Sequence, residues 1–209
     1  MFTGEIMPKR NSLPNDAARP EGPDNAHTRA RIDDAILALM AEGDRLNHDL
    51  VATRSGVSRR TVYRYYPDQA ALRAAAWARV GPAGGIPRTL DEFAGGMAAR
   101  FANFDDKADA MTVVMASAEG RAIRNVMKDE RVAAFRAMLA PRVEALPEPD
   151  RTRAIAVIQY LGSGFAWREM RDQWDMDGAE AAAACGWAVR VLLADLAARG
   201  DKPLADGPA

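Results

Sequence analysis

Residues 48–67 carry the pattern that most constrains how this chain can fold. The segment reads HDLVATRSGVSRRTVYRYYP, two short runs with helical spacing of apolar residues on either side of Gly56-Val57-Ser58. Glycine readily takes the positive φ that ends many helices, and serine is a good N-cap for the next helix. Asn47 can cap the first helix in the same way. The segment therefore predicts a helix-turn-helix, two short helices that cross at a steep angle around a tight turn.

The second run is basic and aromatic. Four arginines (Arg54, Arg59, Arg60 and Arg64) lie within eleven residues, and no acidic residue falls between Asp49 and Asp68. Arginine pairs with guanine edges and phosphates, and hydroxyl groups suit phosphate oxygens. The alternative is a basic helix face that meets only solvent, but framework, turn and basic face coincide here in the right order, which favours DNA binding. The residues that we expect to contact DNA are His48, Ser58, Arg59, Arg60, Thr61, Tyr63, Arg64, Tyr65 and Gln69.

The segment from Gly56 to Pro67, with its Tyr-Arg-Tyr-Tyr-Pro end, resembles the TetR (tetracycline-repressor-like) family of bacterial transcriptional regulators. An amphipathic run that ends at Gly43 supplies the preceding helix of that family, and the resemblance covers residues 29–80. It implies an all-α fold with an N-terminal three-helix helix-turn-helix domain at 26–80 and a C-terminal helical ligand-binding and dimerisation domain at 85–200. The family commonly has lysine where this chain has Gln69, which implies a shallower salt dependence of DNA binding.

Charge and composition narrow the class of protein. The 28 Lys and Arg residues nearly balance 29 Asp and Glu residues, and residues 1–80 are net +2 while the remainder is net −3. This distribution fits a local DNA reader better than a protein that coats nucleic acid. With two histidines, one cysteine and no metal-spaced cluster or nucleophile motif, we expect no enzyme, cofactor or metal site. Cys185 is interpreted as a core thiol, with redox sensing as the alternative.

The rest of the chain predicts helices separated by breaks. We expect helices at about 68–80, 89–104, 108–118, 121–145, 150–174 and 178–199, with a linker at 81–87.

Residues 1–25 are predicted to be a disordered tail, which is either passive or brings Lys9, Arg10 and Arg19 to the minor groove. Residues 201–209 are predicted to be flexible. The sequence shows no apolar run of membrane-spanning length and no signal peptide, so we expect a cytoplasmic protein without a membrane partner.

The first of the last two predicted helices has apolar residues on two faces, which suggests two packing partners. Gly162 and Gly164 inside this helix predict either a close approach or a bend. The TetR resemblance implies that these helices form a four-helix homodimer interface, and a two-fold dimer suits a palindromic operator. The interface residues that we expect are Ile158, Gly162, Phe165, Val189, Leu193 and Leu196.

Methionines and aromatic residues are frequent between residues 97 and 176. Such residues line adaptable apolar pockets, but they also fill ordinary cores. The resemblance implies an effector pocket, for which we expect Phe101, Met111, Met115, Phe135, Met138, Gln159 and Tyr160. The resulting hypothesis is a ligand-responsive repressor that a small apolar effector releases from its operator. The alternative is a helix-turn-helix regulator with no small-molecule effector, and the sequence names neither the operator nor the direction of the response.

Overall fold

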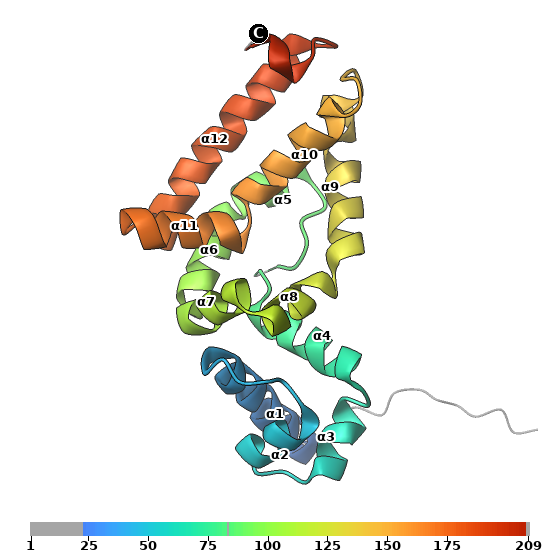
Figure 1. Ribbon diagram of the computed structural model, residues 1–209, viewed down its shortest axis with the longest axis vertical. Coiled ribbons are helices and arrows are strands. Elements are labelled where there is room, and N and C mark those ends of the chain that lie inside the picture. Colours follow the sequence, from blue (N-terminus) through green and yellow to red (C-terminus); the bar gives the residue numbers. More distant parts are fainter. Residues whose placement is uncertain (1–22, 83, 208–209) are drawn as a thin grey trace, which may run out of the picture.

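The computed structural model describes residues 23–82 and 84–207, and within these ranges every regular element is a helix (Figure 1). The helix-turn-helix lies at one end of an elongated molecule and the C-terminus lies at the other. The all-α fold predicted from the sequence is therefore confirmed.

Four helices form the N-terminal domain: α1 (Pro23–Ala41), α2 (His48–Ser55), α3 (Arg59–Tyr65) and α4 (Gln69–Val80). Helix α1 begins at Pro23, so residues 23–25 belong to a helix and not to the predicted tail. Lys9, Arg10 and Arg19 lie outside the described residues. The domain has its own apolar core, whose fully buried members include Ile32, Ile36, Val51, Val62 and Leu72.

The turn between α2 and α3 has the geometry that the sequence predicts. Asn47 Oδ1 accepts a hydrogen bond of 2.9 Å from Leu50 N, and Ser58 Oγ accepts one of 3.1 Å from Thr61 N. Gly56 ends α2 in the left-handed conformation with φ of 65°. Because Val62 is fully buried against the domain core, the opposite face of α3 is left toward solvent.

The C-terminal part, which we call the body, contains more breaks than the sequence pattern predicts. Its helices are α5 (Leu90–Gly95), α6 (Met97–Asp105), α7 (Ala108–Ala116), α8 (Ala118–Asn125), α9 (Lys128–Val143), α10 (Asp150–Leu161), α11 (Gly164–Trp174) and α12 (Gly178–Arg199). The predicted helices at 89–104, 121–145 and 150–174 are thus each interrupted. Apolar periodicity continues across these breaks, because the consecutive helices pack on the same core.

The sequence suggested either a close approach or a bend at Gly162 and Gly164, and the break between α10 and α11 shows both. Gly162 ends α10, and Ser163 caps α11 by accepting hydrogen bonds from Phe165 N and Ala166 N. A Cβ atom on Gly162 would lie only 2.3 Å from Phe93 Cε2. The chain therefore bends at this point and also makes a close approach, although to a side chain.

The C-terminal segment is held on the body as far as residue 207. Arg199 donates hydrogen bonds to the carbonyl oxygens of Pro203 (2.8 Å) and Gly207 (3.0 Å). Asp150 Oδ2 accepts a hydrogen bond of 2.9 Å from Leu204 N, at the start of a short 3-10 helix (Leu204–Asp206). The prediction of a flexible tail from residue 201 is therefore wrong for residues 201–207.

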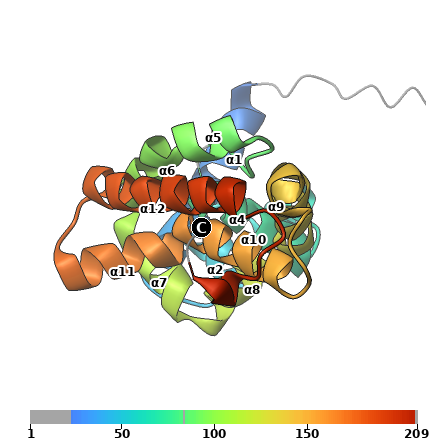
Figure 2. The same ribbon diagram turned by 90° about the horizontal axis from the view of Figure 1, so that it is seen from above.

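Helix α12 is unusually exposed for its composition. An 18-residue window of this helix has a mean hydropathy of 1.5, yet only 28% of that window is buried in the monomer. By length and composition it could span a membrane, which we did not expect from the sequence. The helix nevertheless packs on α6, α10 and α11, and Figure 2 shows it lying beside α10.

Asp105 connects three helices of the body. Its Oδ1 accepts a hydrogen bond of 2.8 Å from Trp167 Nε1 on α11, and its Oδ2 accepts one of 2.6 Å from Gly178 N at the start of α12. Arg171 adds an ion pair of 3.3 Å. Since Trp167 is fully buried, its indole N–H has no access to water as a substitute partner.

We predict that Asp105→Ala lowers the free energy of unfolding by about 1–3 kcal/mol, because it leaves a buried donor unsatisfied. The neighbouring Asp106 is exposed, and Asp106→Ala should change stability by no more than about 0.5 kcal/mol. Urea denaturation of both variants measures the difference. Equal effects would show that Asp105 does not hold the three helices together.

Candidate DNA-binding surface and effector cavity

The exposed face of α3 presents two arginines that lack an acidic partner. Arg60 and Arg64 are exposed, and neither forms an ion pair with a carboxylate in the described part of the chain. The Arg64 guanidinium lies 5.2 Å from the centre of the Tyr65 ring. Both arginines are therefore free to bind phosphates or guanine edges.

Arg59 is oriented differently. Its Nε lies 2.9 Å from Asp49 Oδ1 on α2, and its guanidinium sits 5.5 Å from the centre of the Tyr63 ring. Both partners of the ion pair are largely exposed, so the pair adds little stability. It does hold the Arg59 side chain along the helix-turn-helix and offset part of its charge.

His48 does not reach the surface where we expected it. The side chain is buried, and its Nε2 lies 2.7 Å from the carbonyl oxygen of Tyr66, to which it donates. Its ring stacks on that of Tyr63, with centroids 4.0 Å apart. His48 therefore points into the domain and not toward the exposed face of α3. Its buried ring packs against the inner face of the half-exposed Tyr63.

Two other side chains that we expected to contact DNA form hydrogen bonds within the N-terminal domain. The Tyr65 hydroxyl donates a hydrogen bond of 3.1 Å to the carbonyl oxygen of Asn25, and Gln69 Nε2 donates one of 2.7 Å to that of Leu46. These donors hold α1 and the loop before α2, and the contact of Gln69 with phosphate stays a prediction. The hydroxyls of Ser58 and Thr61 lie 2.8 Å apart at the start of α3 and stay close to its exposed face.

Tyr66 anchors α3 to α1. Its ring is buried and its hydroxyl donates a hydrogen bond to Asp33 Oδ1. Burial, and then the adjacent Asp33 carboxylate, raise the pKa of Tyr66 from its ordinary value of 10.0 to about 12. The folded state therefore keeps the phenol protonated at pH values where the unfolded chain loses the proton.

A raised pKa of this kind adds stability below about pH 10, which is lost as the pH rises toward about 12. We predict that Tyr66→Phe costs about 1 kcal/mol at neutral pH and reduces the loss of stability between these pH values. Tyr160, which is half exposed, provides the control Tyr160→Phe. Chemical denaturation at pH 8 to 12 tests this, and an unchanged pH dependence in Tyr66→Phe would contradict it.

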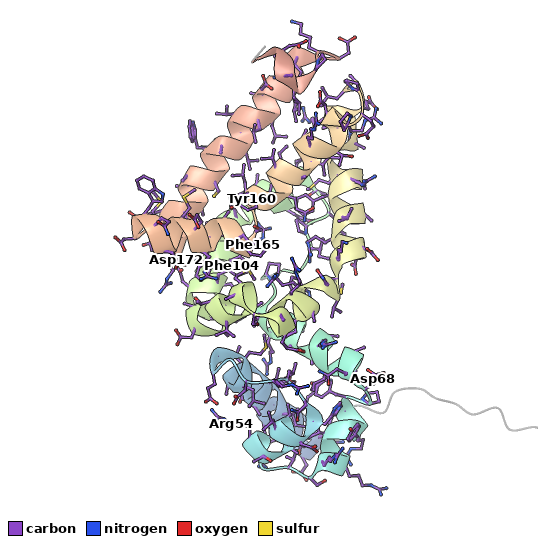
Figure 3. All side chains as sticks on the ribbon, viewed as in Figure 1. Arg54, Asp68, Phe104, Tyr160, Phe165 and Asp172 are labelled. Atoms are coloured by element: carbon purple, nitrogen blue, oxygen red, sulfur yellow. The ribbon has the colours of Figure 1, made fainter. Side chains whose placement is uncertain are left out.

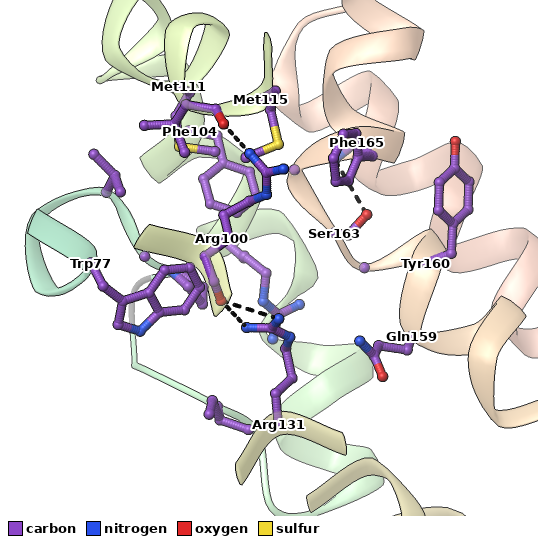
Figure 4. A pocket seen from close by; sticks show the side chains of 18 of the residues that line it. Trp77, Arg100, Phe104, Met111, Met115, Arg131, Gln159, Tyr160, Ser163 and Phe165 are labelled. Carbon is purple, nitrogen blue, oxygen red and sulfur yellow. Dashed lines mark hydrogen bonds between the residues drawn. The ribbon is translucent and has the colours of Figure 1, made fainter. Parts of the chain in front are cut away.

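The body encloses a cavity of about 410 Å³ (Figure 4). Five of the residues that we expected around an effector line it: Met111, Met115, Phe135, Gln159 and Tyr160. Phe101 and Met138 do not line it, and they are buried elsewhere in the core. Helical periodicity identifies an apolar position but does not tell a core position from a cavity wall, which explains these two errors.

The sequence analysis missed the polar part of this cavity. Its lining includes four arginines, Arg100, Arg121, Arg124 and Arg131, and no Asp or Glu. A signal was present for Arg100, which lies on the same helical stripe as the buried Met97, Phe101 and Phe104. An arginine on an otherwise apolar stripe needs a reason to be there.

The cavity reaches the helix that connects the two parts of the molecule. Trp77 and Val80, in the last turns of α4, form part of its wall together with Gly81, Pro82, Ile86 and Pro87 of the following linker. A bidentate ion pair joins Arg73 of α4 to Glu119 of α8, at 2.8 and 3.1 Å. The wall of the cavity thus includes the end of α4, whose first turn lies in the N-terminal domain; Figure 3 labels Phe104 and Phe165 in the body and Asp68 at the start of α4.

Most residues that we expected in a dimer interface face the interior of the monomer. Ile158, Val189 and Leu196 are buried, and Leu193 packs against the same core. Gly162 contacts Phe93, while Phe165 is 44% exposed and lines the cavity. The large apolar side chains that α10 and α12 leave exposed are instead Val157, Tyr160, Trp187 and Val191.

Comparison with known proteins found no matching family model and no matching curated protein. Among solved structures, the chain is similar to the crystal structure of a TetR transcriptional regulator from Rhodococcus sp. RHA1. The sequence identity is 21%, the TM-score is 0.47, and the match covers 81% of this chain and 98% of that chain.

Proposed function

We propose that this protein is a TetR-like transcriptional regulator that binds palindromic operator DNA as a homodimer and responds to a small molecule bound in the body. The observation that carries the DNA-binding part is the pair Arg60 and Arg64. They stand on the exposed face of a correctly capped second helix of a helix-turn-helix, without acidic partners among the described residues. Arginine in this position is suited to phosphates and guanine edges.

The dimer is supported by the apolar surface of the last helices. Trp187 is 63% exposed and Val191 49% exposed, one helical turn apart on α12, and Val157 on the adjacent α10 is 44% exposed. Large apolar side chains that a monomer leaves exposed on neighbouring helices are candidates for an interface. A second copy suits this face better than a lipid bilayer, because α12 also carries Glu180, Arg190 and Asp195.

The response to a ligand is supported by where the cavity lies. A ligand that fits one conformation better shifts the population toward it, and α4 forms part of the cavity wall. A change in the tilt of α4 changes the separation of the two α3 helices in a dimer. We propose that the ligand releases the protein from its operator, which makes it a repressor. The cavity favours this reading over a regulator without an effector.

We predict that Arg60→Ala and Arg64→Ala each weaken binding to DNA recovered from a random pool by about ten- to a hundredfold, the loss expected for a specific arginine contact. Arg142 is exposed on α9 of the body, and Arg142→Ala should bind as the wild type does. Fluorescence anisotropy at fixed salt concentration measures the affinities. Recovery of no preferred DNA by the wild type would sink the proposed function.

We predict that Trp187→Glu converts the dimer into a monomer, because it places a charge in the centre of the apolar face. Val126 at the end of α8, which is not one of the last two helices, is also exposed, and Val126→Glu should leave the oligomeric state unchanged. Sedimentation velocity distinguishes the two species. A wild-type monomer, or a Trp187→Glu dimer, would show that this face is not the interface.

A further inference from the structure

The arginines of the cavity suggest a class of ligand. Arg100 on α6, Arg124 on α8 and Arg131 on α9 line the cavity from three different helices, with Arg121 more exposed on α8. Figure 4 shows Arg100 and Arg131 beside one another in the cavity. None of them forms an ion pair with a carboxylate in the described ranges of the chain, and the cavity lining contains no acidic residue. The cavity is therefore positively charged as well as largely apolar.

Few of the arginine donors are used by the protein. Arg100 is only 5% exposed, and its one described hydrogen bond runs from Nη1 to the carbonyl oxygen of Phe93 at 3.3 Å. Arg131 reaches the carbonyl oxygen of Arg124 at 3.4 Å from both Nη1 and Nη2, which is long for a hydrogen bond. A guanidinium has five N–H donors, so donors remain for a ligand.

The positions of these arginines cost the protein stability. Burial lowers the pKa of Arg100, Arg124 and Arg131, since a charged group loses hydration inside a protein. A buried charge without a counterion is destabilising, and an apolar residue of similar volume avoids that cost. The stability of the ligand-free fold gives no reason for an arginine at position 100, on the apolar stripe of α6. A ligand that supplies the missing negative charge gives such a reason.

Aromatic rings fix the arginine head groups in place. The guanidinium of Arg124 lies 4.9 Å from the centre of the Phe165 ring, and that of Arg131 lies 5.5 Å from the Trp77 ring. Phe104, Met111 and Met115 add apolar surface to the same cavity. The cavity thus combines cationic groups with apolar walls, an arrangement that suits an amphipathic molecule.

We infer that the cavity binds an amphipathic anion, with a carboxylate or phosphate head group held by Arg100, Arg124 and Arg131 and an apolar body against Phe104, Met111 and Met115. The inference deepens the effector part of the proposed function, on which its regulatory meaning rests, and it replaces the purely apolar effector expected from the sequence. Because Arg131 contacts Trp77 of α4, an anion that draws this guanidinium toward itself acts directly on the helix that leads to the DNA-binding domain.

The test is isothermal titration calorimetry of the full chain, without DNA, against decanoate, decyl phosphate and decan-1-ol. We expect at least one of the two anions to bind about tenfold or more tightly than the alcohol, the gain of a charge-assisted hydrogen bond. The preferred anion identifies the head group. Equal binding of all three compounds, or binding of neither anion, would overturn the inference.

Matched variants separate a ligand-binding role from a structural one. Arg100→Met and Arg131→Met should each weaken anion binding about tenfold or more and leave decan-1-ol binding unchanged. Arg136→Met, an exposed position on α9 outside the cavity, should leave both unchanged. The melting temperature of ligand-free Arg100→Met should equal or exceed that of the wild type.

A lower melting temperature of Arg100→Met with unchanged anion affinity would assign the arginine a structural role and overturn the inference. The wild-type affinity for selected DNA is measured without any anion, so it tests the proposed function separately. A protein that binds DNA but neither anion would refute only the present inference.

Discussion

Helix α4 is the constraint on which the rest of the structure depends, because it belongs to both parts of the molecule. Its first turn is capped by Asp68 and held to the helix-turn-helix domain by the hydrogen bond from Gln69 to Leu46. Its middle is tied to α8 by Arg73 and Glu119, and its end brings Trp77 to the cavity. We propose that a helix with both ends fixed in this way carries a change at the cavity to the helix-turn-helix domain.

The body combines stable packing with a costly cationic cavity. Asp105 shows how the packing is secured, since one carboxylate satisfies a buried indole N–H and the first N–H of α12. The cavity arginines show the opposite case, in which the buried Arg100 and the partly buried Arg124 and Arg131 lack acidic partners among the described residues. Proteins accept such local costs mainly at functional sites. This contrast between neighbouring parts of the body supports the proposal that the cavity binds a ligand.

Local signals in the sequence predicted local structure well. The caps Asn47 and Ser58 and the left-handed Gly56 follow from short-range chemistry, and they are all found in the structure. The roles of His48, Gln69 and Arg100 depend on residues far away in the sequence, so composition and periodicity could not assign them. The same holds for the last two predicted helices, where periodicity showed apolar positions and only the packing shows which of them are buried in the monomer.

The central claim is that the cavity and the DNA-binding surface are coupled through α4. The most direct test is the operator affinity of the wild-type dimer with and without a saturating amphipathic anion, together with the anion affinity with and without operator. The account predicts that the anion weakens operator binding by about 5- to 150-fold, and that the operator weakens anion binding by the same factor. Tight binding of both ligands with no mutual effect would contradict it.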